Sequence, residues 1–516
     1  MYPDSLTLGI WSGIVELTST SILKLIETDI YFVKALRRKG FFNLYYLIRK
    51  ECDSMKQLRL SPKYSNFLEK HLSGETMDYR QVIALFLPIL IDQAFIVGLN
   101  LVNTAMISSS GVAAVSAVNM VDSINMFLIN VFVAIATGGT VVVAQYKGSG
   151  NQLMVSKSAA GSVTAVSLTA LVIGMFLVVF HTPILSLLFG GADADVLHSA
   201  RTYLIGSGVS YMGIAIVQAV CGALRGIGKS RASLALSLIT NLLYVLLNIL
   251  FINVLDMGVF GMTLSVNIAR YAGAICALYY IFKLDAALHL GIRDLFTLPL
   301  SMLRKIMFIG VPFAAEQMFF NGGKLLTQVF IVSLGTYAIA TNAIAGSLAA
   351  VLQIPAGALS LTIVTVVGQC IGRGNVADAR KFIRSFLVIG SITLFLIGIL
   401  IMPFFYPLVG IFDPPTEIVH DIFIILLINT IVQMFLWPIS FIAPSALRAA
   451  GDSKFTSITS MLTMWLFRVV LGYLLGITFN FGILGVWLAM NCEWGVRGAI
   501  FMWRYRGTKW YQHKLI

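Results

Sequence analysis

Twelve apolar runs of about 20 residues or more follow one another along this chain from Ile83 onward. In lipid the backbone must satisfy its own hydrogen bonds, so only helices and closed barrels cross a membrane. Barrel strands would read as short segments of alternating polarity, whereas these runs are continuous. The sequence therefore predicts an all-α integral membrane fold with twelve transmembrane helices, near residues 83–107, 118–142, 158–180, 198–221, 233–254, 260–282, 303–332, 341–368, 385–408, 419–443, 456–477 and 482–503.

The composition agrees with a chain whose main solvent is lipid. Of its 516 residues 58% are apolar and 11% are charged, and the mean hydropathy is +0.88. The net charge of +13 follows the membrane topology, so we expect no nucleic-acid partner. The five cysteines are scattered without C-x-x-C spacing, which argues against a disulfide framework or a zinc site: Cys52, Cys221, Cys276, Cys370 and Cys492.

Lysine and arginine fall almost entirely on alternate connections between the predicted spans. Fifteen follow spans 2, 4, 6, 8 and 10, whereas the opposite connections hold Arg201 together with acidic residues such as Asp193 and Glu417. By the positive-inside rule, both ends of the twelve-helix core are expected in the cytoplasm. The fifteen are Lys147, Lys157, Arg225, Lys229, Arg231, Lys283, Arg293, Arg304, Lys305, Arg373, Arg380, Lys381, Arg384, Arg448 and Lys454.

The core contains an internal repeat. A shift of 224 residues aligns Pro88 to Asn151 with Pro312 to Asn375 without a gap, and 18 of the 64 pairs are identical. Each repeat holds an even number of spans, so the two repeats are parallel and related by a pseudo-two-fold axis along the membrane normal. We therefore expect an N-lobe at 81–295 and a C-lobe at 296–516, which ends in a short cytoplasmic tail. This is an arrangement of rocking transporters.

Residues 1–80 lie outside the repeat and form a basic N-terminal extension. The stretch Ile30 to Leu47 mixes four basic residues with aromatics, as an amphipathic helix on the cytoplasmic leaflet would. The alternative is a solvated cap on the core. A thirteenth span over Leu6 to Ile26 is less favoured, because Glu16 and Lys24 interrupt it.

Polar side chains inside the spans are candidates for function because they are costly in lipid. The first span carries Asp92, Gln93, Asn100 and Asn103, and the seventh carries Glu316, Gln317, Asn321, Lys324 and Gln328. The repeat aligns Asp92 with Glu316 and Asn100 with Lys324. Two carboxylates therefore stand at equivalent places, each four residues after a proline.

The functional interpretation is that the polar residues of the first span and those of the seventh span form two stripes, which face each other across a cleft between the lobes. A carboxylate shielded from water there could exchange a proton near neutral pH or bind Na⁺. The alternative is that Asp92 and Glu316 only tie helices together, Glu316 through Lys324. Asp122, near Asn119 and Asn125, is a third candidate for the coupling ion.

Three further ionisable side chains lie in the last span and span 11, and a fourth lies in span 6. Glu493 and Arg497 are four residues apart in the last span and most simply pair with each other. Arg468 in span 11 has no obvious partner in its own helix, and the same is true of Arg270 in span 6.

Catalytic and cofactor motifs are absent from the sequence. The segment that ends Gly228-Lys229-Ser230 lacks the first glycine of a phosphate loop, because Ala223 stands there. The six histidines have no metal-ligand spacing, and no catalytic triad can be assembled. We therefore expect no enzyme activity, no metal and no cofactor apart from a coupling ion.

Four motifs carry a family resemblance: LVNTAMISSSG at 101–111, GTVVVAQYKGSGN at 139–151, ALRGIGKS at 223–230 and ALRAAGDS at 446–453. With them, residues 80–505 resemble the multidrug and toxic compound extrusion (MATE) transporters of the flippase superfamily. The resemblance implies twelve helices in two lobes around a central cavity. It also implies export of organic cations or other xenobiotics in exchange for H⁺ or Na⁺.

Two positions depart from the family pattern. Asn103 stands where many members carry an aspartate, and Phe320 where many carry a glutamate. The sequence instead resembles a bacterial subgroup with a glutamate one turn earlier, here Glu316, followed by Gly323-Lys324. Any coupling is then expected at Asp92, Glu316 or Asp122.

The sequence thus predicts a cation-coupled antiporter of amphipathic, cationic drugs in the inner (cytoplasmic) membrane of a bacterium, acting as a monomer in contact with membrane lipids. The remaining polar residues of the two stripes are expected to line the substrate cavity. A close rival is a flippase for lipid or glycan precursors, whose cavity would carry several cations for phosphate. Two rivals of a different class are a membrane-embedded enzyme, which would need a nucleophile and base or a metal cluster, and a non-transporting scaffold.

Overall fold

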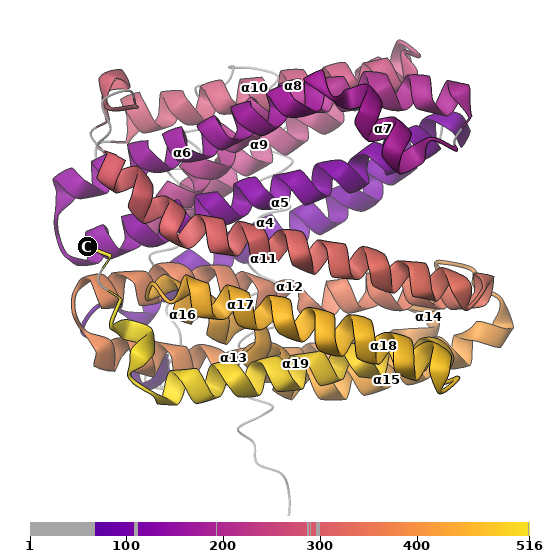
Figure 1. Ribbon diagram of the computed structural model, residues 1–516. Coiled ribbons are helices and arrows are strands. Elements are labelled where there is room, and N and C mark those ends of the chain that lie inside the picture. The colour runs from indigo at the N-terminus through magenta and orange to yellow at the C-terminus, as the bar shows by residue number, and fades with distance from the viewer. Residues whose placement is uncertain are drawn as a thin grey trace, which may run out of the picture. The chain divides into compact units, whose positions relative to one another are not determined.

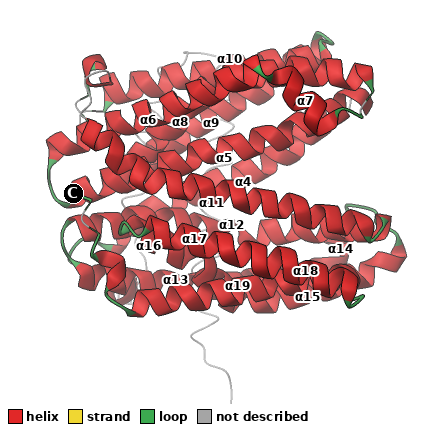
Figure 2. Ribbon diagram, viewed as in Figure 1, coloured by secondary structure: helices red, strands yellow, loops and turns green. Residues whose placement is uncertain are grey.

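The computed structural model describes residues 68–107, 112–191, 193–285, 288, 290–295, 300–513 and 515–516. Gly74 to Ile516 form one compact unit. The ribbon of this unit is helix and loop throughout its described part (Figure 2). The expected interfacial helix at Ile30 to Leu47 lies outside the described residues.

The six spans of the N-lobe follow the predicted order, and each extends past its predicted start or end by a few residues. A short helix, α7 (His181–Phe189), separates the third span from the fourth. The spans are α4 (Tyr79–Ile107), α5 (Val112–Gly148), α6 (Gln152–Val179), α8 (Ala194–Gly226), α9 (Ser230–Asn248) continued by the π-helix η3 (Ile249–Val254), and α10 (Gly258–Tyr279) continued by the π-helix η4 (Tyr280–Leu284).

The six spans of the C-lobe repeat this order with more breaks in the helices. They are α11 (Leu300–Ser333); α12 (Thr336–Gly372); α13 (Val376–Ile401), followed by η6 (Met402–Phe404) and α14 (Phe405–Gly410); α15 (Thr416–Trp437) with η7 (Pro438–Ile442) and α16 (Ala443–Ala449); α17 (Ser453–Thr463) with η8 (Met464–Val470), α18 (Leu471–Tyr473) and η9 (Leu474–Thr478); and α19 (Gly482–Arg506). The short 3-10 helices η5 (Ile292–Leu295) and η10 (Lys509–Tyr511) complete the elements.

Within the described residues, ten helical segments are long and apolar enough to cross a membrane by length and composition. The two remaining spans are α11 and α19, and both carry ionisable residues in mid-helix, Glu316 and Lys324 in α11 and Glu493 and Arg497 in α19. These ionisable residues lower the mean hydropathy of α11 and α19.

The repeat is visible in matching turns. Asn151 caps α6 by accepting a hydrogen bond from the amide of Met154, and Asn375 caps α13 in the same way through Asp378. The glycines that precede these caps, Gly150 and Gly374, have φ values of 77° and 78°. A left-handed backbone at this place favours glycine, which explains why glycine precedes the cap in both halves.

The lobes pack through their first two helices. The N-lobe helix α4 lies against α12, and the C-lobe helix α11 lies against α5, so each lobe offers its first span to the second span of the other. In Figure 1 the remaining N-lobe helices gather above this contact and the C-lobe helices below it. Met302 and Ile306 of α11 are buried within the N-lobe hydrophobic core.

One end of the lobes is joined by a reciprocal contact. Gln145 of α5 donates a hydrogen bond of 2.8 Å to the carbonyl oxygen of Ala449, and the equivalent Gln369 of α12 donates one of 2.9 Å to that of Gly226. A Cβ on Gly148 would overlap the backbone of Gln369, and a Cβ on Gly372 would overlap that of Gln145. The lobes are therefore in close backbone contact at the end that carries the basic connections.

Candidate functional site

Asp92 lies near the middle of α4 and is buried. Its carboxylate is within hydrogen-bonding reach of Ser237 on α9, and Arg225 acts on it electrostatically. Its Oδ1 accepts no hydrogen bond, and Asp92 forms no ion pair with any described residue. A buried carboxylate oxygen without a partner is costly, and a bound proton or cation would relieve that cost.

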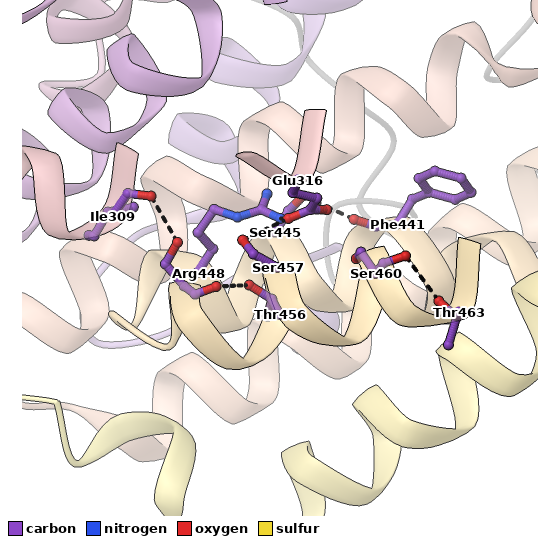
Figure 3. Close-up of polar contacts among 10 residues, drawn as sticks. Ile309, Glu316, Phe441, Ser445, Arg448, Thr456, Ser457, Ser460 and Thr463 are labelled. Carbon is purple, nitrogen blue, oxygen red and sulfur yellow. Dashed lines mark hydrogen bonds and ion pairs between the residues drawn. The ribbon is translucent and has the colours of Figure 1, made fainter. Parts of the chain in front are cut away.

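Glu316, the repeat partner of Asp92, is also buried, but one of its carboxylate oxygens has two partners. Its Oε2 lies 2.9 Å from Nη2 of Arg448 and accepts a 2.9 Å hydrogen bond from the Ser457 hydroxyl. Figure 3 shows the guanidinium and the hydroxyl both directed at the carboxylate. The alternative partner expected from sequence, Lys324, is not the one that the structure gives.

Asp122 belongs to a separate polar cluster between α5 and α8. Its Oδ1 accepts hydrogen bonds from the Tyr203 hydroxyl at 2.9 Å and from Asn125 Nδ2 at 3.1 Å. Asn125 in turn accepts a 2.8 Å bond from the Tyr211 hydroxyl. Arg270 of α10, whose partner the sequence did not reveal, donates to Ser210 at 2.7 Å and acts electrostatically on Asp122.

The C-lobe contains a cavity of about 440 Å³. Its wall includes Lys324 and Gln328 of α11 and the small residues Gly346, Ala349 and Ala350 of α12. The 224-residue shift aligns Gly346 with Asp122 and Ala349 with Asn125. The cavity therefore occupies the place in the C-lobe that the Asp122 cluster fills in the N-lobe.

Cationic side chains gather around Phe320 at this cavity. Lys324 Nζ lies 4.9 Å from the Phe320 ring centroid, and the guanidinium carbons of Arg468 and Arg497 lie at 5.6 and 5.7 Å. The Glu493 carboxylate lies 2.8 Å from Arg497 and 3.7 Å from Arg468. The predicted pairing of Glu493 with Arg497 is thus confirmed, and Arg468 joins it from another helix.

Aromatic rings form the apolar part of the same wall. Trp437 and Phe441 stack with centroids 4.7 Å apart, and Trp494 meets Phe441 edge-on at 5.9 Å. Phe441 lies in the π-helix η7 and Arg468 in the π-helix η8. An extra residue in a helical turn redirects the side chains that follow, and such turns occur often at functional sites.

The cavity residues predicted from the sequence separate into four groups. Lys324 and Gln328 line the C-lobe cavity. Asn321 and Gln317 do not line it, and Asn321 instead donates to the Gln317 carbonyl within α11. Gln93 is half-buried on α4. The side chains of Asn100 and Asn103 lie outside the described part of the structure.

Two features of the site were not found from sequence. The described cavity is lined by C-lobe residues and not by the polar residues of both first helices, and α4 packs on α9 and α12. In the sequence Arg448 belongs to a repeated motif and is marked by nothing else. Its alignment with Arg225 in that motif is a signal that each arginine has a partner on the first helix of its own lobe.

The MatE family profile matches residues 88–250 and 312–474, two segments that begin 224 residues apart, as the internal repeat does. The chain is similar to the uncharacterized transporter YisQ of Bacillus subtilis (strain 168), with 27% identity over 435 residues, which cover 82% of this chain and 93% of that protein.

It is also similar to the probable multidrug resistance protein NorM of Thermotoga maritima, with 26% identity over 460 residues, which cover 87% of this chain and 96% of the relative. Among solved structures, the outward-facing conformation of a multidrug resistance MATE family transporter of the MOP superfamily has a TM-score of 0.76. That match has 19% sequence identity and covers 85% of this chain and 97% of the other, which shows the shared fold.

Proposed function

Because this chain belongs to the MatE family of membrane transporters, we propose that it is a secondary active efflux transporter that exchanges amphipathic organic compounds for H⁺ or Na⁺ by alternating access. It is a multi-pass membrane transporter and not an enzyme. The names of several relatives include multidrug resistance, which supports a cargo of drug-like compounds here as well.

The observation that carries the coupling proposal is the burial of Asp92 without a partner for one of its carboxylate oxygens. Asp92 lies in the N-lobe and has no ion pair among the described residues. A carboxylate in that environment binds a proton or a hard cation more readily than one already neutralised by arginine. We therefore place the primary coupling site at Asp92, with Asp122 as a second group. Glu316 stays a candidate of smaller expected effect because Arg448 neutralises it.

Alternating access requires contacts that close one end of the cavity and can be released. The reciprocal bonds of Gln145 and Gln369 join the lobes at one end of α5 and α12. The cavity residues Gly346 and Ala349 lie near the other end of α12, about 30 Å away at the helical rise of 1.5 Å per residue. In our proposal, separation of the lobes at the glutamine contacts opens the transport pathway toward the side of the membrane on which these contacts lie.

Reconstituted transport tests the coupling directly. Purified protein in proteoliposomes is given a pH or Na⁺ gradient, and uptake of a fluorescent amphipathic dye is followed. We expect Asp92→Asn to lose gradient-driven transport, Asp122→Asn to reduce it, and Glu316→Gln to affect it least. The control is Asp195→Asn, an exposed acid at the start of α8. Wild-type transport by both Asp92→Asn and Glu316→Gln would refute the coupling role.

We further propose that the protein lies in the cytoplasmic membrane of a bacterium with the joined end of the lobes on the cytoplasmic side. The basic residues beside these contacts support this orientation, since positive charge is retained in the cytoplasm. A cysteine at Asp193, in a cysteine-free background, is expected to react with an impermeant maleimide from outside the cell. Reaction only from the cytoplasm would reverse the orientation.

A second candidate function is the movement of a lipid or glycan precursor that carries phosphate. It is favoured by one observation, the lysine and arginine that line the C-lobe cavity. Flipping of a fluorescent phosphatidic acid, measured by dithionite quenching in the same proteoliposomes, tests this candidate. No transfer above protein-free vesicles would exclude it for that class of lipid.

A further inference from the structure

We propose that the C-lobe cavity binds the acidic group of an amphipathic organic anion, with Lys324 and Arg468 facing the acid and the aromatic wall holding the apolar body. This inference rests on the proposed transport function and names the charge of its cargo. It departs from the cationic cargo expected from sequence.

The charges around the cavity do not cancel. Three cations, Lys324, Arg468 and Arg497, surround Phe320, and within the described residues one carboxylate, that of Glu493, is in ion-pair contact with them. Arg497 is the closer partner of that carboxylate, which leaves Lys324 and Arg468 with the weaker share of its charge. The nearby Arg448 is already paired with Glu316.

The two less neutralised cations are also the two that reach the cavity wall. Lys324 is exposed, although it lies within a span, and Arg468 lines the same space from η8. No described carboxylate is in ion-pair contact with Lys324, although the more distant Glu493 acts on it electrostatically, and its Nζ lies 4.9 Å from the Phe320 ring centroid. A cation on the cavity wall attracts a bound anion and repels a second cation, and both effects grow as the bound molecule displaces water from the cavity.

The remainder of the wall suits an amphipathic molecule. Trp437, Phe441 and Trp494 provide flat apolar surfaces, and Gln328 and Asn342 provide hydrogen-bonding groups. The volume of about 440 Å³ is that of a site for one drug-sized molecule, since ligand pockets commonly measure about 300–1,000 Å³. A free organic acid therefore fits better than the whole of a long-chain lipid.

Equilibrium binding with a matched pair of dyes tests the charge preference. Full-length protein in nanodiscs of phosphatidylcholine, without any ion gradient, is titrated with fluorescein, an anion, and with rhodamine 123, a cation on the same ring system, by fluorescence polarisation. We expect tighter binding of fluorescein. Lys324→Gln should raise its Kd at least about tenfold, because a charge-assisted contact is lost, and Lys324→Arg should restore binding to within about threefold of wild type.

The control variant is Arg384→Gln, which removes an exposed cation of α13 away from the cavity wall and should leave both affinities unchanged. Tighter binding of rhodamine 123, or unchanged fluorescein binding by Lys324→Gln, would overturn the proposal. Binding is measured here without an ion gradient. Failure of gradient-driven exchange in the transport assay would therefore contradict the proposed function and leave the binding proposal untouched.

Competition identifies the source of the anionic group. Added phosphatidic acid that displaces fluorescein, while extra phosphatidylcholine does not, supports the anionic site with a lipid as its ligand. Absence of competition by either lipid supports the site with a free organic acid as its ligand.

Discussion

In the N-lobe the first span buries Asp92 without an ion pair to any residue that the structure describes, and in the C-lobe the equivalent Glu316 is held by an arginine and a serine. Both lobes carry the arginine, Arg225 in one and Arg448 in the other, at matching places of a repeated motif. Aspartate is one methylene shorter than glutamate, which accounts for a carboxylate that reaches its arginine only in the C-lobe. In the proposed function, this difference in side-chain length makes Asp92 the more available of the two acids for a proton, because Glu316 is paired with Arg448.

The second span shows the same divergence. Asp122 and Asn125 fill the N-lobe with a hydrogen-bonded cluster, whereas Gly346 and Ala349 leave a cavity in the C-lobe that cations line. At these aligned positions the N-lobe carries a buried acidic side chain, and the C-lobe carries small residues beside a cavity lined by Lys324 and Arg468. The comparison teaches that two repeats with the same helical scaffold can surround aligned positions with side chains of different size and charge.

The largest expected difference between the lobes is in stability. Glu316→Gln leaves Arg448 buried without its counter-ion and should lower the free energy of unfolding by about 3–5 kcal/mol, whereas Asp92→Asn breaks no ion pair and should change it by less than about 1 kcal/mol. Thermal unfolding in detergent measures both. Equal destabilisation by the two variants would contradict the assignment of different roles to these acids.

The reciprocal contact predicts equal effects in the two lobes. Gly148→Ala and Gly372→Ala each place a Cβ against the backbone of the other lobe and should weaken the joined state by about 1–3 kcal/mol. Spin labels at Ser149 and Arg373 report the change in the population of the joined state, because double electron–electron resonance measures the distance between them. Gly335→Ala is unsuitable as a control because its φ of 99° adds strain, so Gly357→Ala, where a Cβ meets nothing within 4 Å, serves instead.

Lengthening Asp92 by one methylene should make the N-lobe resemble the C-lobe. In Asp92→Glu the carboxylate is expected to reach Arg225, and gradient-driven transport should fall about tenfold because the acid is then neutralised by arginine. The charge of the side chain is retained, so an unchanged transport rate would show that pairing with Arg225 does not govern coupling.

A carboxylate can also be added to the C-lobe at the place of Asp122. A Cβ on Gly346 meets nothing within 4 Å, so Gly346→Asp has room in the cavity wall. We expect fluorescein affinity to fall between about fivefold and tenfold and rhodamine 123 affinity to rise, since the added charge offsets Lys324. Gly346→Asn is the neutral control, and a similar loss in it would assign the effect to volume instead of charge.

The smallest effects are expected at the glutamines that join the lobes. Gln145→Ala and Gln369→Ala each remove one hydrogen bond to a carbonyl of the other lobe and should shift the joined state by about 1 kcal/mol, or roughly fivefold in its equilibrium constant. The same spin labels measure both variants. A much larger shift for one of them would break the symmetry of the contact.

The sequence by itself determined the twelve spans and the two-fold repeat. Lipid forces the backbone into helices, so span length and apolar content predict them directly. It also determined the pair of Glu493 and Arg497, because side chains four residues apart on a helix are neighbours. The matching caps at Asn151 and Asn375 also depend on neighbours in the sequence, since each side chain accepts a hydrogen bond from the amide three residues later.

Only the tertiary structure decided the partner of Glu316 and the place of the cavity. Arg448 is 132 residues from Glu316 along the chain, and no periodicity within one helix can indicate such a contact. The cavity depends on small residues of α12 facing side chains that the π-helices η7 and η8 turn toward them. The spacing of residues along a single helix predicts which face is polar, whereas the way helices pack determines what that face meets.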